Sequence, residues 1–306
     1  VQILSEFCTF ATVSTNVFLP ATDASLLIID PSLENKSAGL CDLLVLAEKS
    51  SIQLSLLEKK TNRFLAFEVF PNTDAKEEFN WKSHLEIATT KSKILRQFEF
   101  SKARICVTST QYTLVPEALH HPGDEQTYFK LNFKDATDVK ISGAHINVYD
   151  LFVVYSIENE LHKELLHLFQ DPKIVHHSEV LLNSVNRMSR NNSNRQLFLN
   201  VRQNEIDIIV TEGKKLILLN SFSRNSNEDV LYYTLFVCEQ LGIDIEQIQL
   251  SLLGEIEKES ALFKLLYTYI RKINFCDRSK TLDFSSKFNQ IPAHFYHTLF
   301  NLALCE

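Results

Sequence analysis

Glycine is scarce in this chain, at only six of its 306 residues. Loops that hold phosphate groups bring backbone amides close to the ligand, and a Cβ atom obstructs that approach. The scarcity of glycine therefore argues against an ordinary phosphate-binding enzyme. Positive charge is also limited, because the formal net charge is −7. A nucleic-acid surface needs concentrated lysine and arginine, so we expect no nucleic-acid partner.

Membrane-spanning and disulfide patterns are missing as well. No apolar run approaches the ~20 residues that a transmembrane helix needs, and the start of the chain lacks a basic segment and a clear cleavage site. The six cysteines are scattered without a CxxC pair, which favours small core residues in a reducing compartment. We therefore expect a cytoplasmic protein that is not an integral membrane protein.

Adjacent histidines occur at His120-His121 and at His176-His177. Side chains of adjacent residues point apart on a strand or a helix, so neither pair can chelate a metal alone. A role in a loop or at a helix start explains both pairs better, and we predict no metal site. The chain also has no GxSxG turn and no spacing typical of a catalytic triad, so we assign no catalytic residue.

The segment 195–242 has the clearest pattern in the chain. Ile206, Ile208 and Val210 lie two residues apart, the period of a strand with one buried face. With the runs before and after them, they predict three strands joined by tight turns. A helix follows, because Ser226 and Asp229 have the spacing of a capping box.

The strand portion of this segment has a copy earlier in the chain. A shift of about 154 positions places Leu43 on Leu197 and Ile52 on Ile206, and the second turn then needs a two-residue gap. A helix and another strand follow both copies. This pattern favours a duplication into two α/β lobes with a cleft between them.

The polar run at 190–194 marks the boundary between the lobes. We predict an N-terminal extension at 1–24, a first lobe at 25–190 with a loop insertion at 120–144, and a second lobe at 195–306. Weaker patterns in the first lobe predict a short helix at 114–119, a strand at 128–133 and a strand at 145–155.

Four short segments and their order carry a family resemblance. They are the runs NRFLAFE at 62–68, TLVP at 113–116, VHHS at 175–178 and EDVLYY at 228–233. With its two lobes, the chain resembles the actin-like ATPase superfamily, which includes actin, sugar kinases and chaperone ATPases. Its second lobe resembles bacterial pilus-assembly and cell-division actin homologues. From about Ser25 onward, it is similar to an uncharacterised bacterial family, a domain of unknown function with an actin-like fold.

The resemblance implies a two-lobed α/β fold of the actin-like ATPase (ribonuclease H-like) type, in which duplicated mixed β-sheets are flanked by helices. It also implies where a nucleotide would bind. Actin-like ATPases hold the β- and γ-phosphates in two turns of the type Asp-x-Gly-x-x-Ser/Thr, one in each lobe. The corresponding turns here, at 46–51 and 200–205, contain no glycine. Asn200 stands in place of the second Asp and removes a charge that holds the metal.

Acidic residues in the same turns also oppose phosphate binding. Glu48 and Glu205 would repel phosphate unless Lys49 and Arg202 offset them. The turn that would hold adenosine keeps one glycine, Gly254. Phosphoryl transfer depends on positioning and charge neutralisation, so we expect no ATP hydrolysis.

We therefore predict a protein of unknown function with a degenerate actin-like fold, a pseudo-ATPase that acts as a non-catalytic scaffold or protein-binding module. Its protein partner would contact the inter-lobe cleft or an exposed lobe edge. The alternative is a protein that binds ATP and Mg²⁺ through atypical contacts. The residues of such a remnant nucleotide cleft are Lys49, Ser50 and Ser51 in one lobe and Asn200, Asn204 and Gly254 in the other.

Overall fold

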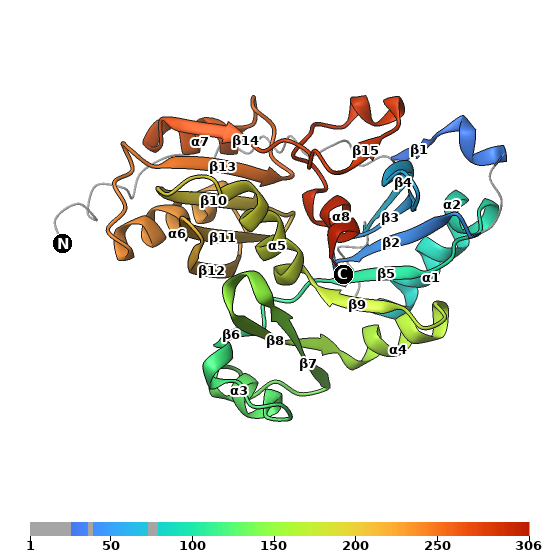
Figure 1. The fold of residues 1–306 in the computed structure, drawn as a ribbon, viewed down its shortest axis with the longest axis horizontal. Coiled ribbons are helices and arrows are strands. Elements are labelled where there is room, and N and C mark those ends of the chain that lie inside the picture. The colour runs from blue at the N-terminus through green and yellow to red at the C-terminus, as the bar shows by residue number, and fades with distance from the viewer. Residues whose placement is uncertain (1–25, 36–38, 73–78, 306) are drawn as a thin grey trace.

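Two large mixed β-sheets lie next to each other, and helices cover their faces (Figure 1). The computed structural model describes residues 26–35, 39–72 and 79–305. The predicted extension at 1–24 lies outside the described residues. No helix in the described part of the chain is long and apolar enough to cross a bilayer.

The first sheet consists of β1 (Leu27–Ile29), β2 (Cys41–Ala47), β3 (Ser51–Glu58), β4 (Arg63–Pro71), β5 (Ala103–Val107), β9 (Lys173–His176) and β15 (Asp283–Phe284). Its strand order is β1–β4–β3–β2–β5–β9, and β15 adds to β4. β3 runs antiparallel to β2 and to β4, whereas β5 runs parallel to β2 and to β9.

The second sheet consists of β10 (Arg195–Val201), β11 (Glu205–Glu212), β12 (Lys215–Ser223), β13 (Gln249–Gly254) and β14 (Lys272–Phe275). Its strand order is β12–β11–β10–β13–β14. The strand directions repeat those of the first sheet, because β10, β11 and β12 are antiparallel neighbours and β13 is parallel to β10 and β14.

The register of the two sheets confirms the predicted duplication. Leu43 pairs with Leu56 in the first sheet, and Leu197 pairs with Val210 in the second, at the predicted shift. The pairing of each middle strand with the third strand also shifts at the same place, after Leu56 in one copy and after Val210 in the other, where the third strand has one extra residue, Leu65 of β4 or Ile217 of β12. A bulge inserts one unpaired residue and increases the local twist, so its repetition is a specific structural mark.

One face of the first sheet is covered by three helices, α1 (Trp81–Lys91), α2 (Lys93–Gln97) and α4 (Asn159–Leu168). One face of the second sheet is covered by two helices, α6 (Asn227–Gln240) and α7 (Ala261–Tyr269). The predicted capping box of Ser226 and Asp229 is present at the start of α6. Helix α5 (His177–Ser189) lies between the two sheets (Figure 1). Its Leu182 belongs to the same apolar cluster as Phe198 of the second sheet.

A small third sheet corrects three sequence predictions. It consists of β6 (Tyr112–Pro116), β7 (Val139–Ile146) and β8 (Leu151–Glu158), with α3 (Glu125–Asn132) packed against it.

The helix predicted at 114–119 is half strand and half helix, because residues 114–116 pair with β8 as part of β6 and Glu117–Leu119 form a 3-10 helix. The strand predicted at 128–133 lies mostly in α3, whose Phe129 is buried against this sheet. The strand predicted at 145–155 is the end of β7 and the start of β8, separated by a turn in which Asp150 is left-handed. Strand pairing and side-chain packing in the tertiary structure thus override these short local patterns.

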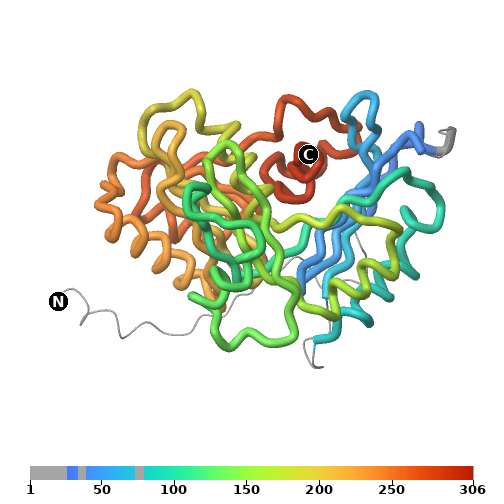
Figure 2. Tube along the Cα trace, turned by 60° about the horizontal axis from the view of Figure 1, so that its bottom comes forward, coloured from blue at the N-terminus to red at the C-terminus, as the bar shows by residue number. Residues whose placement is uncertain are grey.

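The C-terminal part of the chain returns to the first sheet. β15 pairs with β4, and Phe300 of α8 (His297–Asn301) packs on Phe64 with ring centroids 5.0 Å apart. Figure 2 shows this red segment beside the blue strands of the first sheet. Part of the range 195–306 therefore packs with the first sheet, while the lobe boundary near 190–194 stays a prediction.

Truncation of Phe300 tests how much this return contributes to stability. Phe300 is buried among Phe64, Phe67, Phe284 and Phe288. We expect Phe300→Ala to lower the free energy of unfolding by about 3–5 kcal/mol, because it leaves a cavity in a packed aromatic cluster. Chemical denaturation measures this value. The matched control is Phe236→Ala on the exposed side of α6, which should cost below about 1 kcal/mol; equal losses would contradict the packing assigned to α8.

Candidate functional site

The tips of two equivalent hairpins meet between the lobes. The β2–β3 turn is closed by hydrogen bonds between Glu48 and Ser51, and the β10–β11 turn by one from the Arg202 amide to the Glu205 carbonyl. The family resemblance predicts that these turns correspond to the phosphate turns of actin-like ATPases. Glu48 and Arg202 occupy the same position in the two copies, 154 residues apart.

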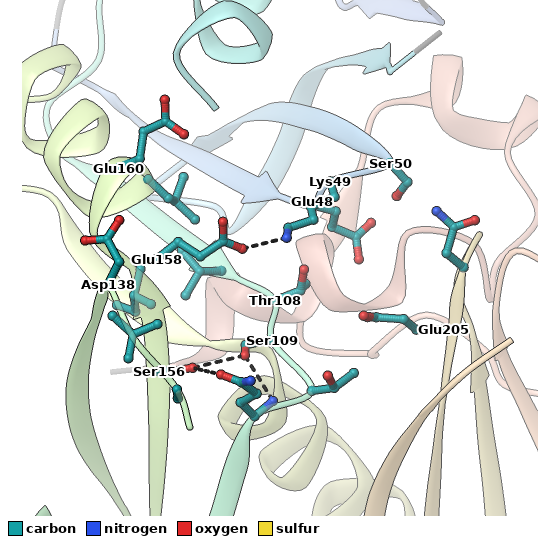
Figure 3. Close-up of a pocket in the computed structure, with 18 of the residues that line it drawn as sticks. Glu48, Lys49, Ser50, Thr108, Ser109, Asp138, Ser156, Glu158, Glu160 and Glu205 are labelled. Atoms are coloured by element: carbon teal, nitrogen blue, oxygen red, sulfur yellow. Dashed lines mark hydrogen bonds and ion pairs between the residues drawn. The ribbon is translucent and has the colours of Figure 1, made fainter. Parts of the chain in front are cut away.

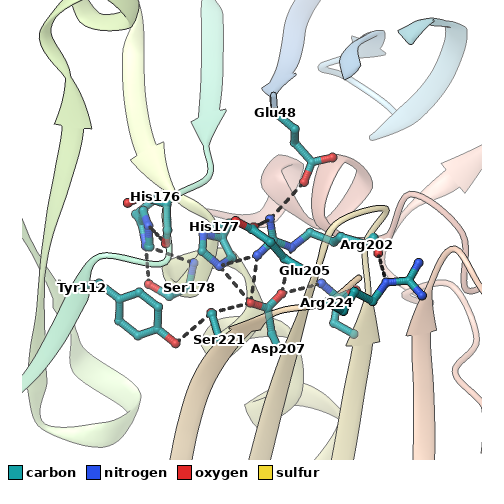
Figure 4. Close-up of polar contacts among 12 residues, drawn as sticks. Glu48, Tyr112, His176, His177, Ser178, Arg202, Glu205, Asp207, Ser221 and Arg224 are labelled. Atoms are coloured by element: carbon teal, nitrogen blue, oxygen red, sulfur yellow. Dashed lines mark hydrogen bonds and ion pairs between the residues drawn. The ribbon is translucent and has the colours of Figure 1, made fainter. Parts of the chain in front are cut away.

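Glu48 and Arg202 pair with each other across the lobes (Figure 4). Arg202 donates from Nη1 to Oε1 of Glu48 over 3.4 Å. The side chains are only 6% and 9% exposed. The duplicated position therefore carries opposite charges in the two lobes, and the two hairpin tips form a buried ion pair.

Arg202 is held more firmly by Asp207, on β11 of its own lobe. The guanidinium donates from Nε to Oδ2 and from Nη2 to Oδ1 of Asp207, each over 3.1 Å. Asn200 donates to Oδ2 of the same carboxylate over 2.9 Å. Glu205 forms a further ion pair with Nη1 of Arg202. Three carboxylates thus share one guanidinium, and a bidentate pair is the strongest arrangement that arginine can make with one of them.

Two side chains of the first lobe are linked to the same carboxylate, His177 directly and Tyr112 through Ser221. Nε2 of His177, the first residue of α5, lies 3.1 Å from Oδ1 of Asp207, which is fully buried. Ser221 of β12 donates to the same Oδ1, and its hydroxyl lies 3.1 Å from the hydroxyl of Tyr112. Asp207 therefore connects the second lobe to α5 and to the small sheet. We call Glu48, Tyr112, His177, Arg202, Glu205, Asp207 and Ser221 the inter-lobe network.

The charges of the network are unequal. Burial opposes ionisation of Asp207, but the charge of Arg202 and the contact with His177 hold the pKa of Asp207 well below its ordinary value. The pKa of Glu48 moves the other way, to about 7, because burial outweighs the more distant contact with Arg202. The Arg202 guanidinium keeps its proton, since the surrounding carboxylates raise its pKa despite burial. Asp207 is thus the ionised partner of Arg202, and Glu48 is only partly ionised near neutral pH.

A cavity of about 580 Å³ lies beside the network (Figure 3). It is lined by the β2–β3 and β10–β11 turns together with residues that follow β5 and residues around the start of β7 and the end of β8. Among the described residues that line it, six are acidic and two are basic. The acidic residues are Glu48, Asp135, Asp138, Glu158, Glu160 and Glu205, and the basic residues are Lys49 and Arg202.

The cavity brings together three of the six residues predicted for a remnant nucleotide cleft, Lys49, Ser50 and Asn204. Lys49 is already engaged, because its Nζ lies 2.8 Å from Oε1 of Glu158. The side chain of Asn204 is exposed. The backbone carbonyl of Asn204 accepts a hydrogen bond from the backbone amide of Arg224.

The other three predicted residues do not line the cavity. Ser51 is buried at the start of β3, where its hydroxyl accepts a hydrogen bond from Gln53. Asn200 is buried and donates to Asp207, so its amide serves the network. Gly254 has φ +80, and a Cβ built on it would lie 2.1 Å from the carbonyl oxygen of Val201. Close packing of β13 on β10 accounts for this glycine.

The sequence pattern missed Asp207 and His177 as site residues. Asp207 looked like the polar alternate of an ordinary strand, and His177 was assigned only to a loop or a helix start. The helix start is confirmed, because His176 is the N-cap of α5 and accepts a hydrogen bond from the Ser178 amide. A signal for the ion pair did exist, since the repeat superposes Glu48 on Arg202. No cluster of three or more potential metal-ligating side chains occurs within the residues that the structure describes.

Comparison with solved structures defines the fold class. A protein from Bacteroides thetaiotaomicron with an actin-like ATPase fold and unknown function has a TM-score of 0.72 and 18% identity, over 88% of this chain and 97% of that one. The match to a PilM–PilN type IV pilus biogenesis complex has a TM-score of 0.60 and 11% identity, and it covers 86% of this chain and 97% of that one. The match to ethanolamine utilization protein EutJ from Carboxydothermus hydrogenoformans has a TM-score of 0.51 and 9% identity, and it covers 90% of this chain and 92% of that one. The chain therefore has the two-lobed actin-like ATPase fold, as predicted.

The family follows from a second comparison. Residues 30–273 match the model of a family described as a protein of unknown function, DUF3822. This match spans most of the chain, and the chain belongs to that family. The comparison with curated proteins finds no match. The predicted resemblance to an uncharacterised family with an actin-like fold is thus confirmed.

Replacement of Asp207 tests the centre of the network. We expect Asp207→Asn to lower the free energy of unfolding at pH 7 by about 3–5 kcal/mol, because it leaves Arg202 buried without its main partner. The pKa of Asp207 is depressed in the folded state, so its contribution is complete above the ordinary value of 3.8 and is lost as the pH falls below it. Urea denaturation at pH 7 and at pH 3.5 measures both effects. The exposed control Asp244→Asn should change little; a loss for Asp207→Asn that grows at lower pH would contradict the assigned charge.

A pair of glycine replacements tests the role of Gly254. Gly254 and Gly242 both have positive φ, but a Cβ on Gly242 would meet no atom within 4 Å. We expect Gly254→Ala to destabilise the protein by about 2 kcal/mol or more beyond Gly242→Ala, because only the first collides with backbone. Thermal unfolding of the two variants gives the comparison. Similar losses would show that φ strain alone explains Gly254.

Proposed function

We propose that this protein is a non-catalytic scaffold of the bacterial cytoplasm that binds a protein partner through its actin-like fold. The ion pair of Glu48 and Arg202 carries this proposal. It joins the two turns that face the phosphates in actin-like ATPases. A nucleotide in the usual position would have to separate these side chains and displace them from the space that the phosphates need.

Electrostatics support the same conclusion. Six carboxylates line the cavity, and both of the basic side chains there already have acidic partners. A triphosphate carries several negative charges, so bringing it into this cavity costs Coulomb energy unless further cations accompany it. Phosphoryl transfer requires the opposite field, in which lysine, arginine or Mg²⁺ neutralises the developing charge.

Two observations support a protein as the partner. The fold is similar to that found in a PilM–PilN type IV pilus biogenesis complex, which is an assembly of two proteins. In addition, β12 ends the second sheet, and among the described residues no strand pairs with its outer side. An open strand edge can accept a strand from another protein. The exposed lobe edge at β12 and the inter-lobe cleft are therefore the surfaces proposed for contact.

The alternative is an atypical ATP-binding protein. The volume of the cavity favours it, because about 580 Å³ lies within the range of small-molecule sites. In that case Lys49, Ser50 and Asn204 would contact the ligand from the two turns.

A thermal-shift titration with Mg-ATP separates the two candidates. We expect the melting temperature to change by less than about 1 °C at millimolar Mg-ATP, because a ligand that does not bind the folded state does not stabilise it. Mg²⁺ with sodium sulfate serves as the control for ionic strength. A rise of several degrees that Lys49→Met abolishes would overturn the scaffold proposal in favour of nucleotide binding.

A further inference from the structure

Glu48 is the one member of the inter-lobe network whose charge is not matched by a close cation. Arg202 already makes two 3.1 Å hydrogen bonds to Asp207 and an ion pair to Glu205, so its 3.4 Å contact with Glu48 is its longest to a carboxylate. A further carboxylate, Glu255, also raises the pKa of Glu48. Like charges that share one cation cannot all be ionised cheaply in a buried site.

Because Glu48 and Arg202 lie between the two lobes, protonation of Glu48 affects how closely the two hairpins approach each other. Glu48 and Arg202 lie at the tips of the two hairpins, whereas the apolar contacts between the lobes involve α5 and the face of the second sheet. If the hairpins move apart about α5, Glu48 gains water and the cavity beside it widens. An ionised Glu48 therefore favours separation of the hairpins, and a protonated one favours contact.

We propose that Glu48 and Arg202 form a proton-controlled latch, which holds the inter-lobe cleft closed while Glu48 is protonated and favours an open form when Glu48 is ionised. This inference goes beyond the scaffold role, because it concerns the relative position of the lobes and needs no partner. It also does not depend on whether a nucleotide binds.

The groups that face Glu48 decide the direction of the effect. They are Arg202, Glu205 and Asp207 from the second hairpin, Glu255 directly after β13 and the buried thiol of Cys106 on β5, with His177 beyond Asp207. The pKa of Asp207 is too low, and that of Arg202 too high, for either to titrate near neutral pH. Burial raises the pKa of Glu255 as well, so Glu255 requires its own control.

Proton linkage gives the expected size. The pKa of Glu48 is about 7 in the closed form, against an ordinary value of 4.5 once the carboxyl is exposed to water. The closed form therefore binds the proton more tightly, and raising the pH favours opening. The ratio of open to closed protein should rise about tenfold per pH unit between these two values and level off above them.

Spin-label distances between the hairpin tips test the latch. Ser50→Cys and Gln203→Cys place labels on the two turns, and the native cysteines of the described residues are buried; Cys8→Ser removes the sixth. Double electron–electron resonance at pH 5, 6, 7 and 8 measures the population with separated tips. We expect this population to increase by tenfold or more from pH 5 to pH 7, with a smaller change above. A distribution that does not change with pH overturns the proposal.

Three variants assign the effect to Glu48. Glu48→Gln should hold the short distance at every pH, because glutamine cannot ionise. Glu255→Gln and the exposed Glu212→Gln, which lies at the far end of β11, should keep the response of the parent protein. A response that persists in Glu48→Gln, or that disappears in Glu255→Gln, contradicts the latch. The pH series of the parent protein decides the question even if Glu48→Gln folds poorly.

Discussion

A single guanidinium group organises the centre of this molecule. Arg202 is almost fully buried and touches three carboxylates, one from the opposite lobe and two from its own. Burial of a charge is expensive, and removal of one partner leaves the other uncompensated. The two hairpins, α5 and the small sheet are therefore tied to one another through the geometry that Arg202 and Asp207 require.

The duplication explains how such a pair arises. In two copies of one hairpin, equivalent residues lie at equivalent tips and face each other when the lobes pack. Glu48 and Arg202 are such a pair, and a hydrogen bond from Arg202 to Glu48 joins the two tips. The family resemblance predicts that the equivalent tips hold phosphate in actin-like ATPases. This chain has the actin-like ATPase fold, and its own side chains fill the junction between the tips.

The reliability of the sequence predictions followed the length and strength of each pattern. The capping box at Ser226 and the period of two in β11 involve neighbours in the chain, so they could be predicted without knowledge of the fold. The segment around Phe129 was assigned to a strand because one short apolar pattern fits either structure. The predicted nucleotide residues Asn200 and Gly254 were placed by analogy, and their contacts within the protein became visible only with the strands paired.

The sequence by itself determined the two strand triplets, their duplication, the capped helix α6 and the absence of glycine from both hairpin turns, because periodicity, capping and composition act between residues that are close in the chain. Only the tertiary structure decided that Glu48 contacts Arg202, that His177 of the other lobe contacts Asp207, and that Phe300 packs on the first sheet. These contacts join segments far apart in sequence. Their energies depend on burial and on distances of a few ångströms, which no local pattern contains.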